Sequence, residues 1–367
     1  MKQSIYMLST TLCLLLCAAC TQADIVVPGP GGKDGVEEGV PLSVKSLDLS
    51  AEVESRSIVT GGPVGDATNP NPLTTVGLCV TKANGSVYAS GNNTQVYTYN
   101  ALAIPAVWEL AEGEESLLLF SEKGTVYAFA PEEKSVSLSG TLKVPLMSGV
   151  KVLDKQKFYF SDGDNPVDAA ADVQWETDQD DYLYCKAETK VDRWNPAVSL
   201  LMQHALAKVC FRVLETGGGS AFAGRLVKKV VLKGSGGLKK ATAAKLNLAT
   251  GELSDTVTVD ELWFTTAGDM RTVGTGETDT KKVAVQAFGL VLPVTGVSVT
   301  LELTLDDDRV FTMSSSEEDG SARTFTANWV GGSNYIYNIN ILPQGIEIAD
   351  IDVAGWNDGD STDVPVE

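Results

Sequence analysis

The chain has 367 residues, 43% of them hydrophobic, which is enough for two domains of ordinary size with buried cores. Its formal net charge of −20 argues against a nucleic-acid partner, because neutralising phosphates requires clustered Lys and Arg. The abundance of Gly, Val, Thr and Ser favours strands and turns over helices.

The N-terminus carries a secretion signal. Lys2 precedes an apolar run that ends at Cys20 and is too short for a permanent transmembrane helix, so residues 1–19 are predicted to be a signal peptide. Residues 16–20 resemble the bacterial lipoprotein lipobox, which predicts lipid attachment at Cys20. The alternatives are a soluble secreted protein cleaved near Ala19, or a Cys20 that forms a disulfide.

The cysteines do not indicate a disulfide framework. Two of the six leave with the signal peptide, and lipidation of Cys20 leaves three, namely Cys79, Cys185 and Cys210. At most one pair could bridge. Their apolar neighbours predict buried, free thiols.

A possible leader strand follows a tether. Residues 21–40 are rich in Gly and Pro and predict a flexible linker. Residues 47–54 then alternate apolar with polar, the pattern of a strand that buries one face, here Leu47, Leu49, Ala51 and Val53. The alternation ends just before Arg56 and Ser57. We expect a strand that is present during folding and is removed by cleavage between those two residues; the alternative is an ordinary first strand followed by a surface Arg.

The rest of the chain reads as an all-β protein. Short apolar segments separated by turn signals run from residue 76 to 144 and again from 225 to 305, which is typical of a sandwich or barrel. The best short helical candidates are residues 107–112 and the region near residues 169–172. Residues 198–213 hold two apolar faces of opposite parity, which predicts a bulge or a single helical turn across His204–Lys208.

No pattern indicates an enzyme. His204 is the only His and lies in an apolar run, so we expect a structural residue hydrogen-bonded to the backbone. Because no nucleophile, zinc or phosphate-binding motif accompanies it, no catalytic residue, metal or cofactor is assigned. The acidic segments 162–168, 178–181 and 306–308 lack EF-hand spacing and are predicted to be solvated loops, with calcium binding as the alternative.

Five features in chain order resemble the fimbrillin family of Bacteroidales, the subunits of protease-assembled type V pili. They are the lipobox, the junction at residues 55–57, and residues 126–131, 200–211 and 328–339 with 354–359. Met202 departs from the family pattern, which often has an aromatic residue before the His. The resemblance implies two tandem transthyretin-like β-sandwich domains, placed at residues 57–197 and 198–367 after a lipid-anchored tether and leader strand at residues 20–56.

The resemblance also implies a route of assembly. A lipoprotein precursor in the outer membrane would be cleaved after Arg56 by an Arg-specific surface protease, and a strand from a neighbouring pilin subunit would fill the emptied groove. Four inserted apolar side chains could contribute ~6–10 kcal/mol. The candidate donor is residues 345–356, with Ile346 and Ile348 in one phase and Ile351 and Val353 in the other. The alternative is that this segment closes its own domain.

We therefore expect a structural subunit of a cell-surface pilus that supports adhesion, with other pilin subunits and a host or bacterial surface ligand as partners. The alternative is a pilus-tip adhesin or surface glycan-binding lipoprotein that does not polymerise. A tip subunit would need a groove but no donor strand.

Overall fold

The computed structural model describes residues 37–49, 63, 72–88, 94–138, 143–161, 174–216, 221–276, 283–313, 323–355 and 362–364. Contacts between Cα atoms group Gly39–Glu367 as one compact unit and Met1–Glu38 as another. Throughout the described ranges the secondary structure consists of strands and turns without helices, so the all-β prediction is confirmed. Accordingly, no described helix is long and apolar enough to cross a membrane.

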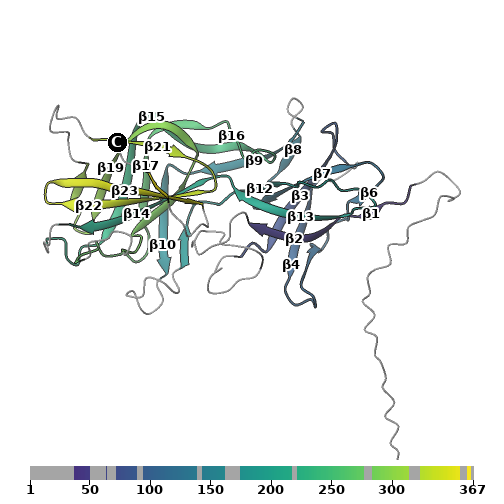
Figure 1. Cartoon of the computed structure of the whole chain (residues 1–367), viewed down its shortest axis with the longest axis horizontal. Coiled ribbons are helices and arrows are strands. Elements are labelled where there is room, and N and C mark those ends of the chain that lie inside the picture. The colour runs from purple at the N-terminus through teal and green to yellow at the C-terminus, as the bar shows by residue number, and fades with distance from the viewer. Residues whose placement is uncertain are drawn as a thin grey trace, which may run out of the picture. The chain divides into compact units, whose positions relative to one another are not determined.

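The first large sheet has seven strands and is built mainly from the N-terminal half (Figure 1). Only its first pair, β2 with β13, is parallel; every other neighbour is antiparallel. In spatial order the strands are β2 (Ser43–Leu49), β13 (Ala197–His204), β12 (Leu183–Lys186), β7 (Gly124–Ala130), β3 (Thr75–Lys82), β4 (Thr94–Asn100) and β5 (Val107–Leu110). Strands β1 (Val40–Pro41) and β6 (Leu118–Leu119) form a separate, two-stranded antiparallel sheet.

The second sheet has ten strands. Its main path is β11 (Gln174–Thr177), β10 (Lys155–Ser161), β17 (Val257–Thr266), β15 (Val227–Asn247), β19 (Val294–Leu305) and β20 (Val310–Thr312). Four more strands pair off this path: β8 (Val136–Leu138), β9 (Pro145–Val152), β16 (Leu253–Ser254) and β21 (Phe325–Trp329).

Strand β15 changes partners half-way along its 21 residues. Its first part pairs with β17 and β19, and its last part pairs with β9 and β16. The glycines among residues 234–237 let this strand bend where the partners change: Gly236 has φ 67°, and a Cβ on Gly237 would lie 2.6 Å from Cγ1 of Val297.

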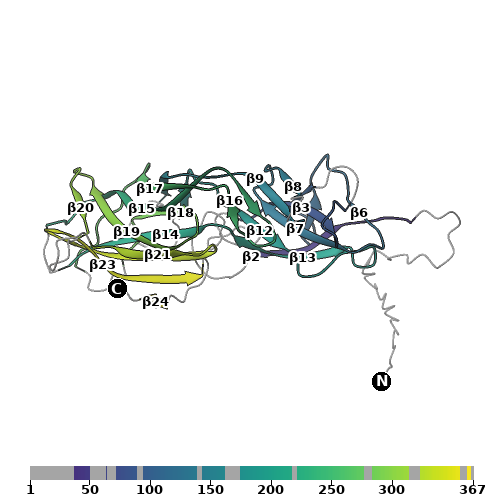
Figure 2. The same ribbon diagram turned by 90° about the horizontal axis from the view of Figure 1, so that it is seen from above.

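The third sheet has five strands and is built from the C-terminal half (Figure 2). Its order is β18 (Ala287–Val291), β14 (Ala207–Glu215), β22 (Ser333–Leu342), β23 (Gly345–Gly355) and β24 (Thr362–Val364). Strands β14 and β22 are parallel. Side chains of this sheet and of the ten-stranded sheet share the largest apolar cluster, in which Phe211 packs against Phe264 and Tyr337.

The proposed boundary between residues 197 and 198 falls at the start of β13. This strand completes the seven-stranded sheet by pairing with β12 and β2. Conversely, β10 precedes the boundary but pairs with β17 and contributes Phe158 and Phe160 to the C-terminal cluster. The division into two tandem domains stays a prediction. Strands on each side of the proposed boundary pair with strands on the other side, as β13 does with β2 and β10 does with β17.

The structure contradicts one local prediction, a helix at residues 107–112, and confirms another, an interruption after His204. The helix predicted at residues 107–112 is wrong, because Val107–Leu110 is β5, paired with β4. The second helical candidate, near residues 169–172, lies outside the described residues. The expected interruption between His204 and Lys208 is confirmed, because β13 ends at His204 and β14 begins at Ala207 in a different sheet.

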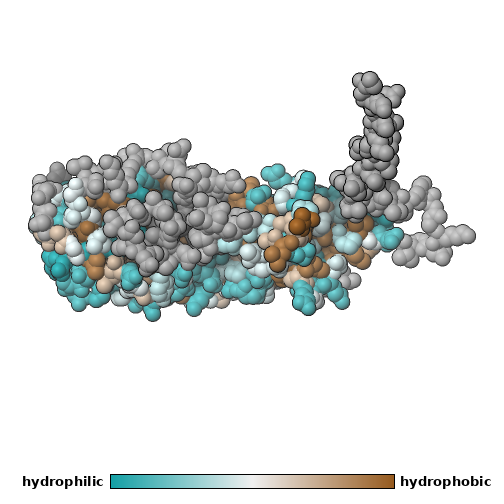
Figure 3. Space-filling view, turned by 90° about the horizontal axis from the view of Figure 1, so that it is seen from below, coloured by the Kyte–Doolittle hydropathy of each residue, from teal (hydrophilic) through white to brown (hydrophobic). Residues whose placement is uncertain are grey.

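The described surface carries a few large exposed apolar side chains. The most exposed are Leu102 at 93% and Ile104 at 99%, in the turn between β4 and β5. Figure 3 shows hydrophobic residues gathered over one part of the face it displays, among hydrophilic ones. Exposed apolar groups of this kind commonly mark contacts with partners.

Candidate functional site

Strand β2 lies at an edge of its sheet. It ends the strand order, and among the strands that the structure describes its one hydrogen-bonded neighbour is the parallel strand β13. Just before it, the amide of Leu42 donates to the carbonyl of Leu117 at 2.9 Å, and the amide of Ser43 donates to the carbonyl of Pro196 at 2.9 Å. An edge strand can be withdrawn without breaking a ladder on its far side, which suits it to exchange.

The buried face of β2 is larger than the alternation predicted. Leu47 and Leu49 are buried, as expected for a strand facing a core, and Leu42 and Val44 are buried as well. The second pair has the opposite parity because the pairing register shifts: Val44 lies opposite Val198, whereas Ser46 lies opposite Ser199. Lys45 is the extra residue of this β-bulge. It shifts the buried side chains from even-numbered positions before it to odd-numbered positions after it.

Beside β2 in the same sheet, β13 presents apolar side chains. Leu47 is the register partner of Leu200, and Leu49 is the register partner of Met202. Val198, Leu200 and Met202 are all buried, so their predicted common face is confirmed. Removal of β2 would uncover these side chains together with one edge of the β13 backbone.

Tyr97 on β4 fastens the start of the leader segment. Its phenolic oxygen donates a hydrogen bond to the carbonyl of Leu42 at 2.8 Å. Burial raises the pKa of Tyr97 to about 12, so the phenol is protonated and remains a donor at neutral pH. Tyr97 is buried in the same apolar cluster as Leu42 and Trp108.

Several predicted site residues lie outside the described part of the chain. They are the lipidation residue Cys20, the leader positions Ala51 and Val53, and the processing residues Arg56 and Ser57. Their assignments therefore stay predictions. The described strand ends at Leu49, seven residues before the predicted scissile Arg56 in the sequence.

The candidate donor segment is placed in its own sheet. Strand β23 pairs with β22 along its whole length and with β24 near its end. Ile346 and Ile351 are buried in the C-terminal cluster, while Ile348 and Val353 are half-buried and pack against it. The expected break is a bulge: Ile348 and Asp350 face consecutive residues of β22, and Ala349 between them is skipped.

A polar group across three strands holds β23 in register. Nδ2 of Asn338 on β22 donates to Oδ2 of Asp352 on β23 at 3.0 Å, and Nη1 of Arg212 on β14 lies 3.6 Å from the same oxygen. Asp352 and Asn338 are buried. A buried carboxylate is costly unless it is paired, so these partners favour this position of β23. Alternation of apolar residues, the only signal read in this segment, could not reveal it.

The sole histidine has a side-chain partner. Nδ1 of His204 lies 2.9 Å from Oδ2 of Asp181, and both side chains are buried. At this nitrogen the partner is a carboxylate and not the backbone group that the sequence predicted. Asp181 belongs to residues 178–181, so its burial also departs from the prediction of a solvated acidic loop there. Asp181 lies just before β12, which pairs with β13, and its neighbour Tyr182 is fully buried.

The remaining cysteines are buried and free, as predicted. Burial raises the pKa values of the Cys185 and Cys210 thiols, which keeps both protonated and unreactive at neutral pH. The thiol of Cys210 also donates to Oδ1 of Asn334 at 3.3 Å.

The acidic segment 162–168 lies outside the described residues, whereas the carboxylates of segment 306–308 are engaged by protein partners. Nη1 of Arg225 lies 3.7 Å from Oδ2 of Asp306 and 3.2 Å from Oδ2 of Asp307. Asp306 accepts a hydrogen bond from the amide of Leu226, Asp307 from the guanidinium of Arg309, and Asp308 from Lys228. Among the described residues no three His, Cys, Asp or Glu side chains converge as metal ligands would.

A model of fimbrillin-like proteins matches residues 68–356, which is most of the chain. The chain belongs to the fimbrillin-like family. This fimbrillin-like protein is therefore a fimbrial, cell-surface structural protein and not an enzyme. Comparison with curated proteins gives no match.

Solved structures from Bacteroides are similar to this fimbrillin-like chain at low identity. A proposed cell adhesion protein of B. uniformis is 17% identical, with 89% of this chain and 100% of that chain covered and a TM-score of 0.48. A proposed cell adhesion protein of B. ovatus is 15% identical, with 87% of this chain and 100% of that chain covered and a TM-score of 0.49. A fimbrial protein of B. vulgatus is 14% identical, with 86% of this chain and 99% of that chain covered and a TM-score of 0.46. The family assignment rests on the family match alone.

Proposed function

We propose that this chain is a structural subunit of a fimbria that supports cell adhesion, and that β2 is a temporary leader strand. In this account a lipoprotein precursor, acylated at Cys20, is cleaved after Arg56 by an Arg-specific surface protease. The product loses residues 20–56, and a strand from a neighbouring subunit pairs with β13 in place of β2.

The observation that carries the proposal is the position of β2. It is an edge strand that precedes Arg56 in the sequence, yet it buries four apolar side chains in the N-terminal core: Leu42, Val44, Leu47 and Leu49. Their burial is worth ~6–12 kcal/mol before ordering costs. An empty groove of this kind would be prone to aggregation, so a leader that stays until assembly protects the subunit.

The test is proteolysis of the purified precursor with an Arg-specific protease. We expect a product that begins at Ser57 and polymerises, and an Arg56→Ala variant that does neither. Arg323→Ala is the matched control, because Arg323 is an exposed Arg remote in sequence from the leader. Polymerisation of Arg56→Ala at the wild-type rate would refute the proposal.

A second candidate function is a terminal subunit that accepts a strand but donates none. The observation in its favour is that β23 completes its own sheet and is fixed there by Asp352, Asn338 and Arg212. A subunit whose β23 is engaged in this way would have to release the strand from β22 and β24 before donating it. Such a chain would occupy one end of a fimbria.

A cross-strand disulfide separates the two functions. Asn340 on β22 and Glu347 on β23 are register partners, and their side chains are 3.1 Å apart. Replacing both with Cys should lock β23 in place under oxidising conditions. Loss of self-polymerisation in the oxidised variant, restored by reduction, would identify β23 as a donor. Unchanged incorporation of the oxidised variant at a fimbrial end would favour the terminal subunit.

A further inference from the structure

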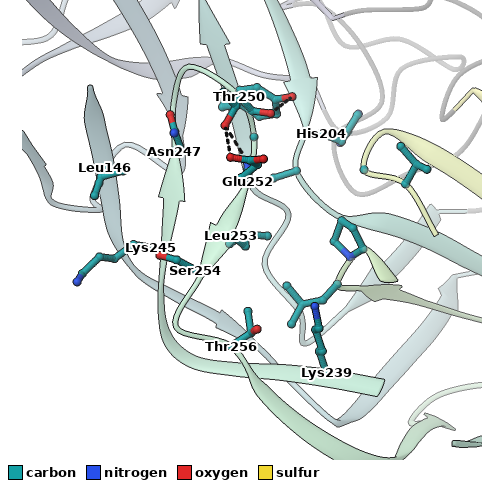
Figure 4. A pocket seen from close by; sticks show the side chains of 17 residues that line it. Leu146, His204, Lys239, Lys245, Asn247, Thr250, Glu252, Leu253, Ser254 and Thr256 are labelled. Atoms are coloured by element: carbon teal, nitrogen blue, oxygen red, sulfur yellow. Dashed lines mark hydrogen bonds between the residues drawn. The ribbon is translucent and has the colours of Figure 1, made fainter. Parts of the chain in front are cut away.

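A pocket of about 570 Å³ lies beside the hairpin that joins β15 to β16 (Figure 4). Its walls come from this hairpin, from the connection between β18 and β19 at Leu292 and Pro293, and from the turn after β21 at Val330. This volume is within the range typical of small-molecule sites. None of the strand-exchange residues discussed above lines it.

One lysine of this pocket is unusual for its strand. Strand β15 contains six lysines, and five have partners: Lys228 with Asp308, Lys229 with the ring of Trp263, Lys233 with Glu302, Lys240 with Asp154, and Lys245 with Asp255. Within the described residues, Lys239 has no ion pair, hydrogen bond or ring contact. In Figure 4 the side chain of Lys239 points toward the other lining side chains, whereas that of Lys245 extends away from them.

The uncharged part of the lining is amphipathic. Leu253, Pro293 and Val330 provide apolar surface, and Val330 is 61% exposed. Ser254 and Thr256 add hydroxyl groups that take no protein partner in the part of the chain described. Hydroxyls that can both donate and accept, next to apolar surface, suit a ligand with hydroxyl groups and C–H faces.

The charge of the lining limits the ligand further. The carboxylate of Glu252 shares the pocket with Lys239, and it already accepts a hydrogen bond from the hydroxyl of Thr250 at 3.3 Å. One available ammonium in a pocket that also holds one carboxylate suits a ligand with a single negative charge better than a phosphate, which would need several donors. On a chain with a net charge of −20, an unpaired lysine is a local exception that favours an anion.

We propose that this pocket binds an acidic monosaccharide unit of a surface glycan, a sialic or uronic acid. Lys239 bonds the sugar carboxylate, Ser254 and Thr256 bond ring hydroxyls, and Pro293 and Val330 contact the C–H face. The inference rests on the proposed adhesive function and supplies its ligand class. It does not depend on strand exchange, so a subunit that fails to polymerise could still bind.

The test is NMR titration of the uncleaved precursor, which keeps β2 and therefore stays unpolymerised, with free N-acetylneuraminic acid and glucuronic acid, and with galactose and glucose as neutral probes. We expect at least one acid to bind, and to bind at least tenfold more tightly than either neutral sugar. The two acids distinguish a sialic-acid from a uronic-acid source. Binding of the preferred acid should weaken as NaCl is raised, since the contact is ionic.

Lys239→Met keeps most of the apolar stem and should lower the affinity for the acid at least tenfold. Its matched control is Lys240→Met, which removes an adjacent lysine that points to the other face and pairs with Asp154. Thr256→Val keeps the side-chain shape and should weaken acidic and neutral sugars alike. Thermal unfolding of each variant checks that the fold is intact.

Three outcomes would overturn the proposal: no saccharide binds, neutral and acidic sugars bind equally, or Lys239→Met binds as the wild type does. Binding of a short peptide with a free C-terminal carboxylate in place of the sugars would reassign the pocket to a peptide. Polymerisation after cleavage at Arg56 is measured separately, so failure of the glycan site and failure of the subunit function are distinguishable.

Discussion

At the scale of single residues, the leader strand is held by a few buried side chains. Leu47 is 2% exposed and lies opposite Leu200 on β13. The next residue, Asp48, points to the opposite face of the strand and is exposed. The alternation of the sequence identified Leu47 and Leu49 because a strand with one buried face repeats every two residues.

Leu47→Ala should lower the free energy of unfolding of the precursor by about 2–5 kcal/mol, through lost burial and a residual cavity. Leu201→Ala is the control, because Leu201 is 51% exposed on β13 and should change stability by less than about 0.5 kcal/mol. Urea unfolding measures both. Once the leader has been removed, Leu47→Ala should have no effect; an equal cost in the cleaved subunit would contradict the account.

Tyr97 gives the leader a pH dependence. Its pKa of about 12 in the folded chain lies above its usual value, so the neutral phenol is favoured by folding. That stabilisation is complete below about pH 10 and is lost as the pH rises toward 12. Tyr97→Phe should be less stable than wild type by about 1 kcal/mol at neutral pH, for want of the bond to Leu42.

The difference between wild type and Tyr97→Phe should then shrink between about pH 10 and pH 12, because only the wild type gains by ionising when it unfolds. Urea unfolding of both proteins across this range measures it. A difference that stays constant would show that the phenol ionises alike in both states.

At the scale of elements, the two candidate exchange strands differ in how they are held. Strand β2 uses apolar side chains and one backbone neighbour, whereas β23 has neighbours on both sides and a buried carboxylate. Asp352→Ala leaves Arg212 without its carboxylate partner and should cost about 3 kcal/mol of stability.

Glu347→Ala is the control on the same strand. Its hydrogen bond to Asn340 is only part-buried, so its loss should cost less than about 1 kcal/mol. Guanidinium unfolding followed by Trp fluorescence compares the two. Equal small losses would mean that the polar group does not hold β23.

Sequence patterns missed the features that depend on pairing with residues far away in the chain. The bulge at Lys45 depends on pairing with Val198 and Ser199, about 150 residues away, so local alternation could not show that Leu42 and Val44 are also buried. Val107–Leu110 became a strand because β4 precedes it and pairs with it. Asp181 meets His204 only through the folding of β12 beside β13. The free thiols and the interruption after His204 were predictable, since neighbouring residues determine both.

At the scale of the whole molecule, acidity opposes unspecific association. Subunits of a chain with a net charge of −20 repel one another, so a specific inserted strand must overcome this repulsion. Raising NaCl from about 20 to 200 mM shortens the Debye length from roughly 20 to 7 Å and should accelerate polymerisation of cleaved subunits. Light scattering after cleavage is complete measures this rate; slower polymerisation at higher salt would indicate attraction between oppositely charged surfaces instead.

The central claim is that β2 is removed before the subunit enters a fimbria. N-terminal sequencing of the subunit taken from assembled fimbriae tests it most directly. The account predicts a start at Ser57, with Leu42, Val44, Leu47 and Leu49 absent from the assembled protein. A subunit that begins at Cys20 and keeps residues 43–49 within the fimbria would contradict it.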